Sequence, residues 1–220
     1  MAKITTEKIL SEKAKQDALV VIETVYIKEK KWIQSSKEEI LKEIVCDNTF
    51  SWFLTRVNDK PAGVLRLFYD PPLEMPKDFE VTLNSEIDLK KLSENARFVE
   101  IGRFMILPKY RRNVLVALRL MREAIKEVVE RDYTHFITDV FEGEPNSPFH
   151  FHTKILGFEV IGKHLHGELN CSLTRIILTL DILKAYKRIK EKRNKIYRLL
   201  SDDVRELLEK KLRSKKLPAL

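Results

Sequence analysis

Hydrophobic residues recur along the first 45 positions with the period of an α-helix. One face of this stretch carries Leu19, Ile22, Val25 and Tyr26, and a second, shorter stripe carries Ile40, Leu41 and Ile44. Side chains three and four positions apart lie on the same face of a helix. The pattern therefore predicts that residues 6–45 are helical.

From position 49 the pattern changes to runs rich in aromatic and β-branched residues, which are typical of strands. Residues 50–57 and 62–68 predict two strands, and the residues between them, which include Asn58 and Pro61, predict a turn. Residues 78–96 are charged and show no clear period, so they receive no assignment.

The second half of the chain predicts strands and helices in alternation. Strands are expected at 97–107, 135–141, 158–162 and 172–180, an amphipathic helix at 114–131, and a short helix between Ser147-Pro148 and Gly157. A strand–helix–strand step requires parallel neighbours joined by a right-handed crossover, whereas the hairpins are antiparallel. The sequence therefore predicts an α/β fold: a mixed central sheet flanked by helices.

Charge is concentrated at one end of the chain. The net charge is +8, but residues 184–220 hold 14 basic against 5 acidic residues, and the remaining chain holds 27 against 28. We therefore predict a domain at 1–183 and a basic helical extension at 184–220, in which Ser201 caps a last helix. Such a segment suits an acidic protein or an anionic membrane surface, or it is simply a solvated helix face. Its few aromatic residues make nucleic acid an unfavoured partner.

Composition narrows the class of protein. Apolar residues make 44% and charged residues 34% of the chain, which excludes a disordered protein. No run approaches the roughly 18 apolar residues that a membrane span needs, and no export signal is recognised, so a cytoplasmic protein is predicted. Cys46 and Cys171 predict reduced thiols. Two His-x-His pairs invite a zinc interpretation, but the pair at His150 starts a helix, where its members diverge, so no metal site is predicted.

Residues 98–112 hold the densest candidate chemistry. Glu100 and Arg103 lie in a predicted strand among apolar residues, where a charge is costly unless it is paired or used. Their odd spacing predicts that they face opposite sides of the sheet; the alternative is an edge strand with solvated charges. The basic turn that follows, at a helix N-terminus, suits a phosphate or pyrophosphate.

These motifs resemble the GNAT acyltransferase superfamily over roughly residues 19–180. The segment from Pro108 through Arg112 and the Leu156-Gly157-Phe158 motif match its general pattern. Glu100-Ile101-Gly102-Arg103-Phe104 resembles the Glu-x-(Ser/Gly)-Arg-Phe of one branch. That branch contains N-acyl amino acid synthases, acyl-homoserine lactone synthases and ornithine-lipid N-acyltransferases.

The resemblance implies transfer of an acyl group from a thioester to the amine of an amino acid or a similar small acceptor. Glu100 would receive the amine proton, Arg103 would orient the acceptor, and residues 26–32 would cover it. His152 stands where relatives place a Tyr, allowing for one extra residue, and would protonate the leaving thiolate; the alternative is a histidine without a role. The donor would be held by the backbone or side chains of Met105, Ile106, Leu107, Arg111, Arg112, Asn113, Val114, Leu115, Val116, Ala117 and Asn146.

One departure from the family pattern leaves more than one acyl donor possible. Leu115 stands where most relatives have the first glycine of the phosphate loop, and its Cβ restricts positive φ and close phosphate approach. The predicted donor is therefore acyl-coenzyme A, acetyl-coenzyme A or the phosphopantetheine of an acyl carrier protein, which the basic extension would attract. A small-group N-acetyltransferase and a non-catalytic binding protein of the same fold remain the alternatives.

Overall fold

A computed structural model of the chain describes residues 2–73, 79–85, 87–88, 91, 94, 96–167, 169–191 and 195–214. Eight strands in these residues form one sheet in the order β1-β2-β3-β5-β6-β8-β7-β4. Among them only β5 and β6 run parallel, and the other neighbours are antiparallel. The strands are β1 (Ile4–Lys8), β2 (Phe50–Val57), β3 (Lys60–Tyr69), β4 (Thr82–Leu83), β5 (Phe98–Ile106), β6 (His135–Phe141), β7 (Glu159–His164) and β8 (Arg175–Asp181).

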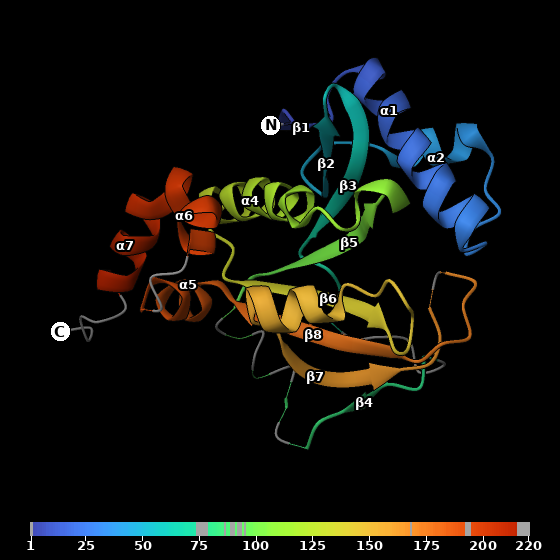
Figure 1. Cartoon of the computed structure of the whole chain (residues 1–220). Coiled ribbons are helices and arrows are strands. Elements are labelled where there is room, and N and C mark those ends of the chain that lie inside the picture. The colour runs from blue at the N-terminus through green and yellow to red at the C-terminus, as the bar shows by residue number, and fades with distance from the viewer. Residues whose placement is uncertain are drawn as a thin grey trace.

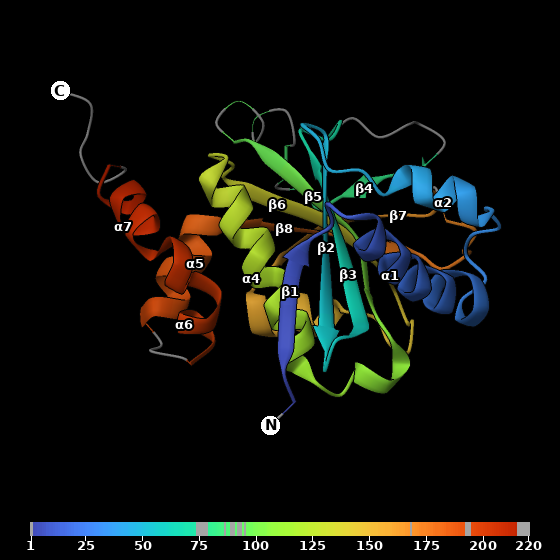
Figure 2. The same ribbon diagram turned by 90° about the horizontal axis from the view of Figure 1, so that it is seen from above.

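Helices cover both faces of this sheet (Figures 1 and 2). Helices α1 and α2 lie on one face of β2 and β3, and α4 lies on the opposite face, so the predicted mixed α/β fold is confirmed. The helical segments are α1 (Glu12–Ile22), the π-helical η1 (Glu23–Glu29), α2 (Lys37–Glu43), η3 (Pro108–Tyr110), α4 (Val114–Glu130), the π-helical η4 (Phe151–Leu156), α5 (Ile182–Glu191), α6 (Lys195–Ser201), η5 (Asp202–Val204) and α7 (Arg205–Ser214).

The N-terminal prediction is wrong at its start. Residues expected to begin a helix form β1 instead, an edge strand that pairs antiparallel with β2. The hydroxyls of Thr6 and Thr55 lie 2.7 Å apart across this pair. Helix α1 starts later because the Ser11 hydroxyl accepts a hydrogen bond from the amide of Ala14, which fixes the N-terminus of the helix.

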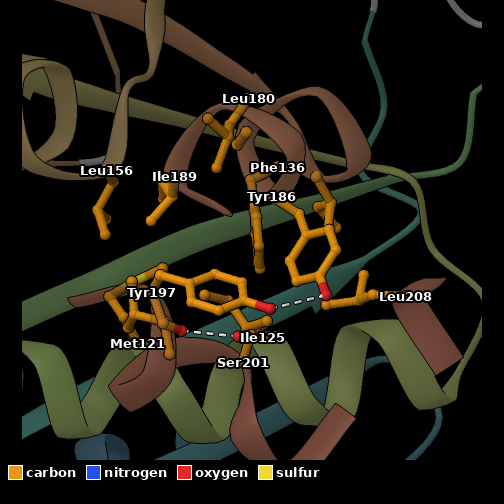
Figure 3. Close-up of a pocket in the computed structure, with 13 residues that line it drawn as sticks. Met121, Ile125, Phe136, Leu156, Leu180, Tyr186, Ile189, Tyr197, Ser201 and Leu208 are labelled. Atoms are coloured by element: carbon orange, nitrogen blue, oxygen red, sulfur yellow. Dashed lines mark hydrogen bonds between the residues drawn. The ribbon is translucent and has the colours of Figure 1, made fainter. Parts of the chain in front are cut away.

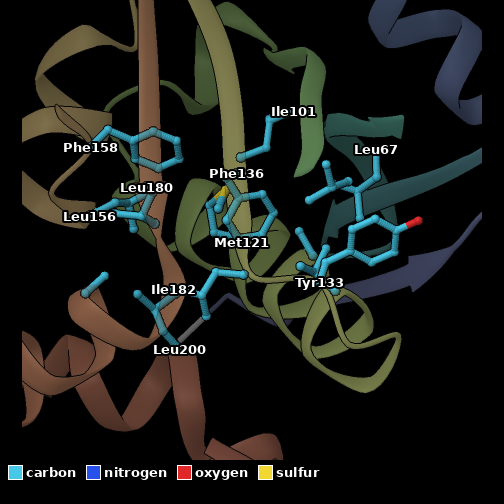
Figure 4. Close-up of a cluster of buried hydrophobic side chains, with 14 of the residues drawn as sticks. Leu67, Ile101, Met121, Tyr133, Phe136, Leu156, Phe158, Leu180, Ile182 and Leu200 are labelled. Atoms are coloured by element: carbon cyan, nitrogen blue, oxygen red, sulfur yellow. The ribbon is translucent and has the colours of Figure 1, made fainter. Parts of the chain in front are cut away.

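The C-terminal helices complete the hydrophobic core on the α4 side of the sheet. Leu200 is buried in the same cluster as Met121 and Phe136 (Figure 4). Val204 and Leu208 belong to this cluster too. Of the predicted extension, residues 192–194 and 215–220 lie outside the described residues. The division of the chain at 183/184 stays a prediction.

Two details of this region concern the predicted cap at Ser201. Its hydroxyl makes no cap; it donates to the carbonyl oxygen of Tyr197 at 2.6 Å (Figure 3). The turn is held instead by Asp203, whose carboxylate accepts two hydrogen bonds from Arg122 of α4, at 2.7 and 2.5 Å.

A small apolar cavity of about 40 Å³ remains between these helices and the sheet (Figure 3). No helix in the described residues has the length and apolar character of a membrane span.

Candidate active site

The central opening of the sheet lies where the two parallel strands separate. Strands β5 and β6 are paired from Phe98–His135 to Glu100–Ile137, and in the described residues the pairing ends there. One position further, the Thr138 hydroxyl donates to the carbonyl oxygen of Ile101 at 2.8 Å and so occupies the start of the gap. A cavity of about 410 Å³ opens at this point, a volume within the range of small-molecule sites.

A β-bulge in β5 shapes one wall of this cavity. Gly102 opposes Arg66 of β3 and Met105 opposes Val64, so β5 spans three positions where β3 spans two. Arg103, inside the bulge, has φ of 50°. An extra residue reverses the alternation of side chains beyond it. Glu100 and Arg103 therefore both line the cavity, and the prediction that they face opposite sides of the sheet is wrong.

The Glu100 carboxylate lies against the guanidinium group of Arg66. The distance from Glu100 Oε1 to Arg66 Nη2 is 3.5 Å, and about a third of the Glu100 side chain (34%) remains exposed, which leaves room for a ligand. Gly102 makes this arrangement possible. A Cβ at that position would lie 2.9 Å from Arg66 Nη2 and 3.0 Å from Glu100 Oε1.

Arg103 lies on the side of the cavity formed by the N-terminal helices. Its guanidinium group is 3.8 Å from a carboxylate oxygen of Glu43 in α2 and 5.6 Å from the ring centre of Tyr26. Burial raises the pKa of Tyr26 above its usual range, and the positive charge of Arg103 opposes that rise. At neutral pH, Tyr26 therefore presents a neutral phenol to the cavity.

The segment after α1, which the resemblance assigned to the acceptor cover, contributes to the cavity wall. Tyr26, Lys30 and Trp32 line the cavity. Trp32 lies 4.3 Å, centre to centre, from the ring of Phe141 at the end of β6, and Lys30 forms an ion pair with Glu144. These contacts join the half of the sheet that carries β5 to the half that carries β6.

The backbone amides predicted to hold the thioester carbonyl are not equivalent. The amide of Leu107 donates to the carbonyl oxygen of Ala62 in β3 at 2.9 Å, so it is already engaged, and this part of the prediction is corrected. Amide directions alternate along a strand. The amide of Ile106 therefore points to the other edge of β5, toward the gap, and both Met105 and Ile106 line the cavity.

The predicted phosphate-binding turn is only partly exposed. Arg111 lines the cavity, but its guanidinium group is engaged by Glu29 at 2.8 and 2.5 Å and by the carbonyl oxygen of Ile106 at 3.1 Å. Arg112 is exposed, as are Val114 and Leu115 at the start of α4. Asn113 is the N-cap and accepts from the amide of Leu115 at 3.2 Å.

Two residues of the predicted donor site have buried side chains. Val116 and Ala117 are buried beneath the helix start, 0% and 6% exposed, so their side chains pack on the protein rather than on a ligand. Leu115 is helical, which is why a side chain is tolerated there: the backbone of this turn adopts no positive φ. The glycine-free turn is therefore compatible with a helix N-terminus open to an anion.

His152 lies in the cavity wall, but its environment differs from the expectation of a near-neutral pKa. The side chain is fully buried, neither ring nitrogen has a hydrogen-bond partner among the described residues, and burial lowers the pKa to about 3. The ring is therefore neutral at pH 7. His152 lies in a π-helical turn, in which the amide of Gly157 donates to the carbonyl oxygen of His152 at 2.7 Å. Asn146 also lines the cavity.

The sequence reasoning missed the polar group on the opposite wall. Asp139 of β6 lines the cavity together with His164 of β7 and Arg175 of β8. The signal was present: Asp139 is a lone carboxylate in the strand His135-Phe-Ile-Thr-Asp-Val-Phe, where it interrupts apolar positions. Among the described residues, no three His, Cys, Asp or Glu side chains are placed to hold a metal ion.

Residues 23–121 match the family model described as the acetyltransferase (GNAT) domain, a segment that includes β5 and its bulge. This segment of the chain has the sequence pattern of a GNAT acetyltransferase domain. The predicted resemblance is thereby confirmed, as is the prediction of an acyltransferase-type enzyme at the level of this domain. The sequence matches no curated protein.

Solved GNAT structures share the fold at low sequence identity. FeeM, an N-acyl amino acid synthase from uncultured soil microbes, superposes with a TM-score of 0.61 at 14% identity, over 85% of this chain and 95% of FeeM. A GNAT acetyltransferase from Streptococcus pneumoniae gives 0.57 at 14% identity, over 82% and 99% of the two chains. Aminoglycoside 6'-acetyltransferase type Ii gives 0.56 at 13% identity, over 82% and 97%. At these identities the likeness establishes the fold alone.

Proposed function

We propose that this GNAT protein is an N-acyltransferase that moves an acyl group from a thioester donor to the amine of an amino acid or similar small acceptor. The observation that supports the proposal is the opening between β5 and β6. It brings a carboxylate (Glu100), an inward-facing backbone amide (Ile106) and a cavity of about 410 Å³ together at one point. The likeness of the fold to an N-acyl amino acid synthase points the same way.

The reaction needs a proton acceptor for the amine and a donor for the tetrahedral oxyanion. The amine nitrogen attacks the thioester carbonyl carbon while Glu100 takes up a nitrogen-bound proton, directly or through one water. The oxyanion that forms accepts a hydrogen bond from the amide of Ile106. Collapse of the intermediate breaks the carbon–sulfur bond and leaves an amide and a thiolate. The thiolate takes up a proton from water, and Glu100 returns the proton that it took from the amine to solvent, so no net proton is gained or lost.

Neutral His152 is the residue that we assign to contact the leaving sulfur. A neutral imidazole keeps one N–H group, and His152 has no partner for it among the described residues. We therefore assign to His152 a hydrogen bond to the departing sulfur, in place of the general-acid role expected from the sequence. Arg103 stays our predicted contact for the acceptor carboxylate, because a guanidinium group binds a carboxylate in two-point fashion.

The cavity lining supports an acyl group longer than acetyl. Apolar side chains from both halves of the sheet form much of the wall, among them Phe68, Leu73, Phe79, Ile137 and Ile177. Such a surface stabilises methylene groups by roughly 0.8 kcal/mol each when they are buried. An acetyl group leaves most of that surface unused.

The donor carrier is acyl-coenzyme A or an acyl carrier protein. Arg112 and the helix start at Asn113 face solvent, where either carrier presents a phosphate. A carrier protein is acidic, and the basic excess of residues 184–220 would attract it, as it would an anionic membrane surface. Part of this charge is used within the fold, since Lys190 pairs with Glu209 and Lys211 with Asp132.

The proposal is tested by thiol release from octanoyl-coenzyme A and acetyl-coenzyme A, each with a panel of amino acids. We expect turnover with octanoyl-coenzyme A and a fall of about 10²- to 10⁴-fold in kcat/KM in Glu100→Gln, which keeps the shape but removes the base. Glu142→Gln is the matched control, because Glu142 is exposed, pairs with Lys163 at 2.7 Å and does not line the cavity.

Three results would overturn parts of this proposal. Turnover of acetyl-coenzyme A without any turnover of octanoyl-coenzyme A would make the protein a small-group acetyltransferase. Undiminished activity of Glu100→Gln would remove Glu100 as the base. No thiol release from either thioester, or from octanoyl acyl carrier protein, would leave a non-catalytic binding protein.

A further inference from the structure

Asp139 stands on the wall of the cavity that faces Glu100. Ile137, two residues before it on β6, is the register partner of Glu100 on β5. Side chains two positions apart share a face of a strand, so Asp139 follows Ile137 on the cavity side, and Phe141 follows Asp139. All three line the cavity. The cavity therefore carries a carboxylate from each of the two parallel strands, besides Glu144, which is paired with Lys30.

Asp139 is the most exposed of three neighbouring polar side chains, the other two being His164 and Arg175. Its side chain is 41% exposed, whereas those of His164 and Arg175 are 4% and 6% exposed. His164 Nε2 and Arg175 Nη1 lie 3.3 and 3.5 Å from Asp139 Oδ2. All three side chains line the cavity, and Asp139 is the most exposed of them.

The two groups behind Asp139 are themselves fixed. His164 Nδ1 lies 2.8 Å from the carbonyl oxygen of His166, and Nε2, on the other side of the ring, faces Asp139. Arg175 Nη2 donates to the carbonyl oxygen of Leu169 at 3.0 Å. Three neighbouring strands and the loop between β7 and β8 therefore set the position of one carboxylate.

This carboxylate is ionised at neutral pH. Burial acts to raise the pKa of Asp139, but the contact with His164 and the positive charge of Arg175 outweigh it and hold the pKa below its usual range. The Asp139 side chain stays 41% exposed and lines the cavity, so its carboxylate is open to a further partner on that side. Its natural complement is a cationic group of a ligand.

We propose that Asp139 binds a second cationic group of the acceptor, so that the acceptor is a diamino compound, such as a diamino acid, rather than a monoamine. This inference rests on the proposed function, because it names the acceptor class of the same cavity. One amine would face Glu100 and the thioester, and the other would face Asp139.

The spacing of the two carboxylates suits such a molecule. Neighbouring strands lie about 4.8 Å apart and two residues advance about 6.6 Å, which puts the Cα atoms of Glu100 and Asp139 roughly 8 Å apart before the strands separate further. Two ammonium groups joined by a few methylene groups span a gap of this order. A monoamine contacts only one of the two carboxylates.

The test compares L-lysine and L-2,4-diaminobutyrate with L-norleucine, a neutral amino acid of nearly the same length as lysine, each with octanoyl-coenzyme A. We expect kcat/KM for the better diamino acid to exceed that for norleucine at least tenfold in the wild type. Asp139→Asn should remove most of this ratio while norleucine turnover stays within about threefold. Glu142 directly follows the strand that carries Asp139, but it does not line the cavity, so Glu142→Gln should keep the ratio.

A binding measurement separates this inference from the proposed function. Calorimetry with each amino acid and no thioester should show tighter binding of a diamino acid than of norleucine, and Asp139→Asn should abolish the difference. If that holds while no thioester is consumed, the acceptor assignment stands and the proposed function fails. Equal use and equal binding of norleucine by the wild type, or an equal loss for all acceptors in Asp139→Asn, would overturn the assignment.

Discussion

The burial of His152 leads us to predict how the unfolding free energy of the protein changes with pH. The imidazole is fully buried, and its ring centre lies 5.5, 5.7 and 4.9 Å from those of Phe104, Phe151 and Phe158. These rings offer no hydrogen bond to an imidazolium N–H group. Protonation of His152 in the folded protein is therefore strongly opposed, and burial lowers its pKa from 6.5 to about 3.

A lowered pKa in the folded state makes stability fall in acid. Below pH 6.5 the unfolded chain binds a proton at His152, and the folded chain does not until about pH 3. Stability supplied by the neutral ring is therefore complete above pH 6.5 and decreases as the pH falls toward 3. Integration of the proton uptake gives a loss of about 2 kcal/mol at pH 5 from this one residue.

The perturbation that tests this reasoning is His152→Leu, which has a similar volume and no titrating group. Urea unfolding at pH 8 and pH 5 gives the change in unfolding free energy for each protein, and the other titrating groups contribute equally to both. We expect the wild type to lose about 2 kcal/mol more than His152→Leu over this interval. Parallel losses would show that His152 is solvated or hydrogen-bonded in the folded protein and would refute the assignment of a dry neutral ring.

Two further substitutions test the site and the core. Gly102→Ala places a Cβ 2.9 Å from Arg66 Nη2 and 3.0 Å from Glu100 Oε1, both at the ends of flexible side chains. We expect a small change in melting temperature but a loss of about 10²-fold in kcat/KM, because the base is displaced; unchanged kinetics would contradict the geometry at Glu100. Leu208→Ala should cost about 2–5 kcal/mol in urea unfolding, since Leu208 is 1% exposed, whereas Leu10→Ala, at a side chain 73% exposed, should cost little. Equal costs for the two leucine variants would show that α7 does not belong to the core.

The parts of the fold that could be predicted from the sequence are those with long, regular patterns. Helix α4 has apolar residues at helical spacing over its length, and β5 and β6 are apolar runs bounded by turns. The two short edge strands, β1 and β4, were missed because a few residues hold too little periodicity to outweigh their surroundings. Tertiary pairing forms them: β1 exists because β2 offers it an open edge.

The site was predictable in residue type and not in geometry. The Glu100–Phe104 motif indicated where the chemistry lies, but the bulge at Arg103 depends on how β5 pairs with β3, which strand alternation does not encode. The pKa of His152 was expected to be near neutral, because the three aromatic rings that surround this side chain come together only in the folded chain. Asp139 was missed for the same reason, since its partners His164 and Arg175 stand on two other strands.

The basic extension must be reconsidered in light of its packing. Tyr186, Leu200 and Leu208 are buried in the same cluster as the central sheet, and Arg188 donates to the carbonyl oxygen of Leu156 at 2.8 Å against Gly157. Removing residues 184–220 would therefore uncover the core, and a loss of activity after deletion would report unfolding rather than a lost partner. Attraction of an acidic carrier therefore has to be tested by reversing exposed charges. Such changes alter the electrostatic field around the helices, while the buried side chains that hold the helices in place are kept.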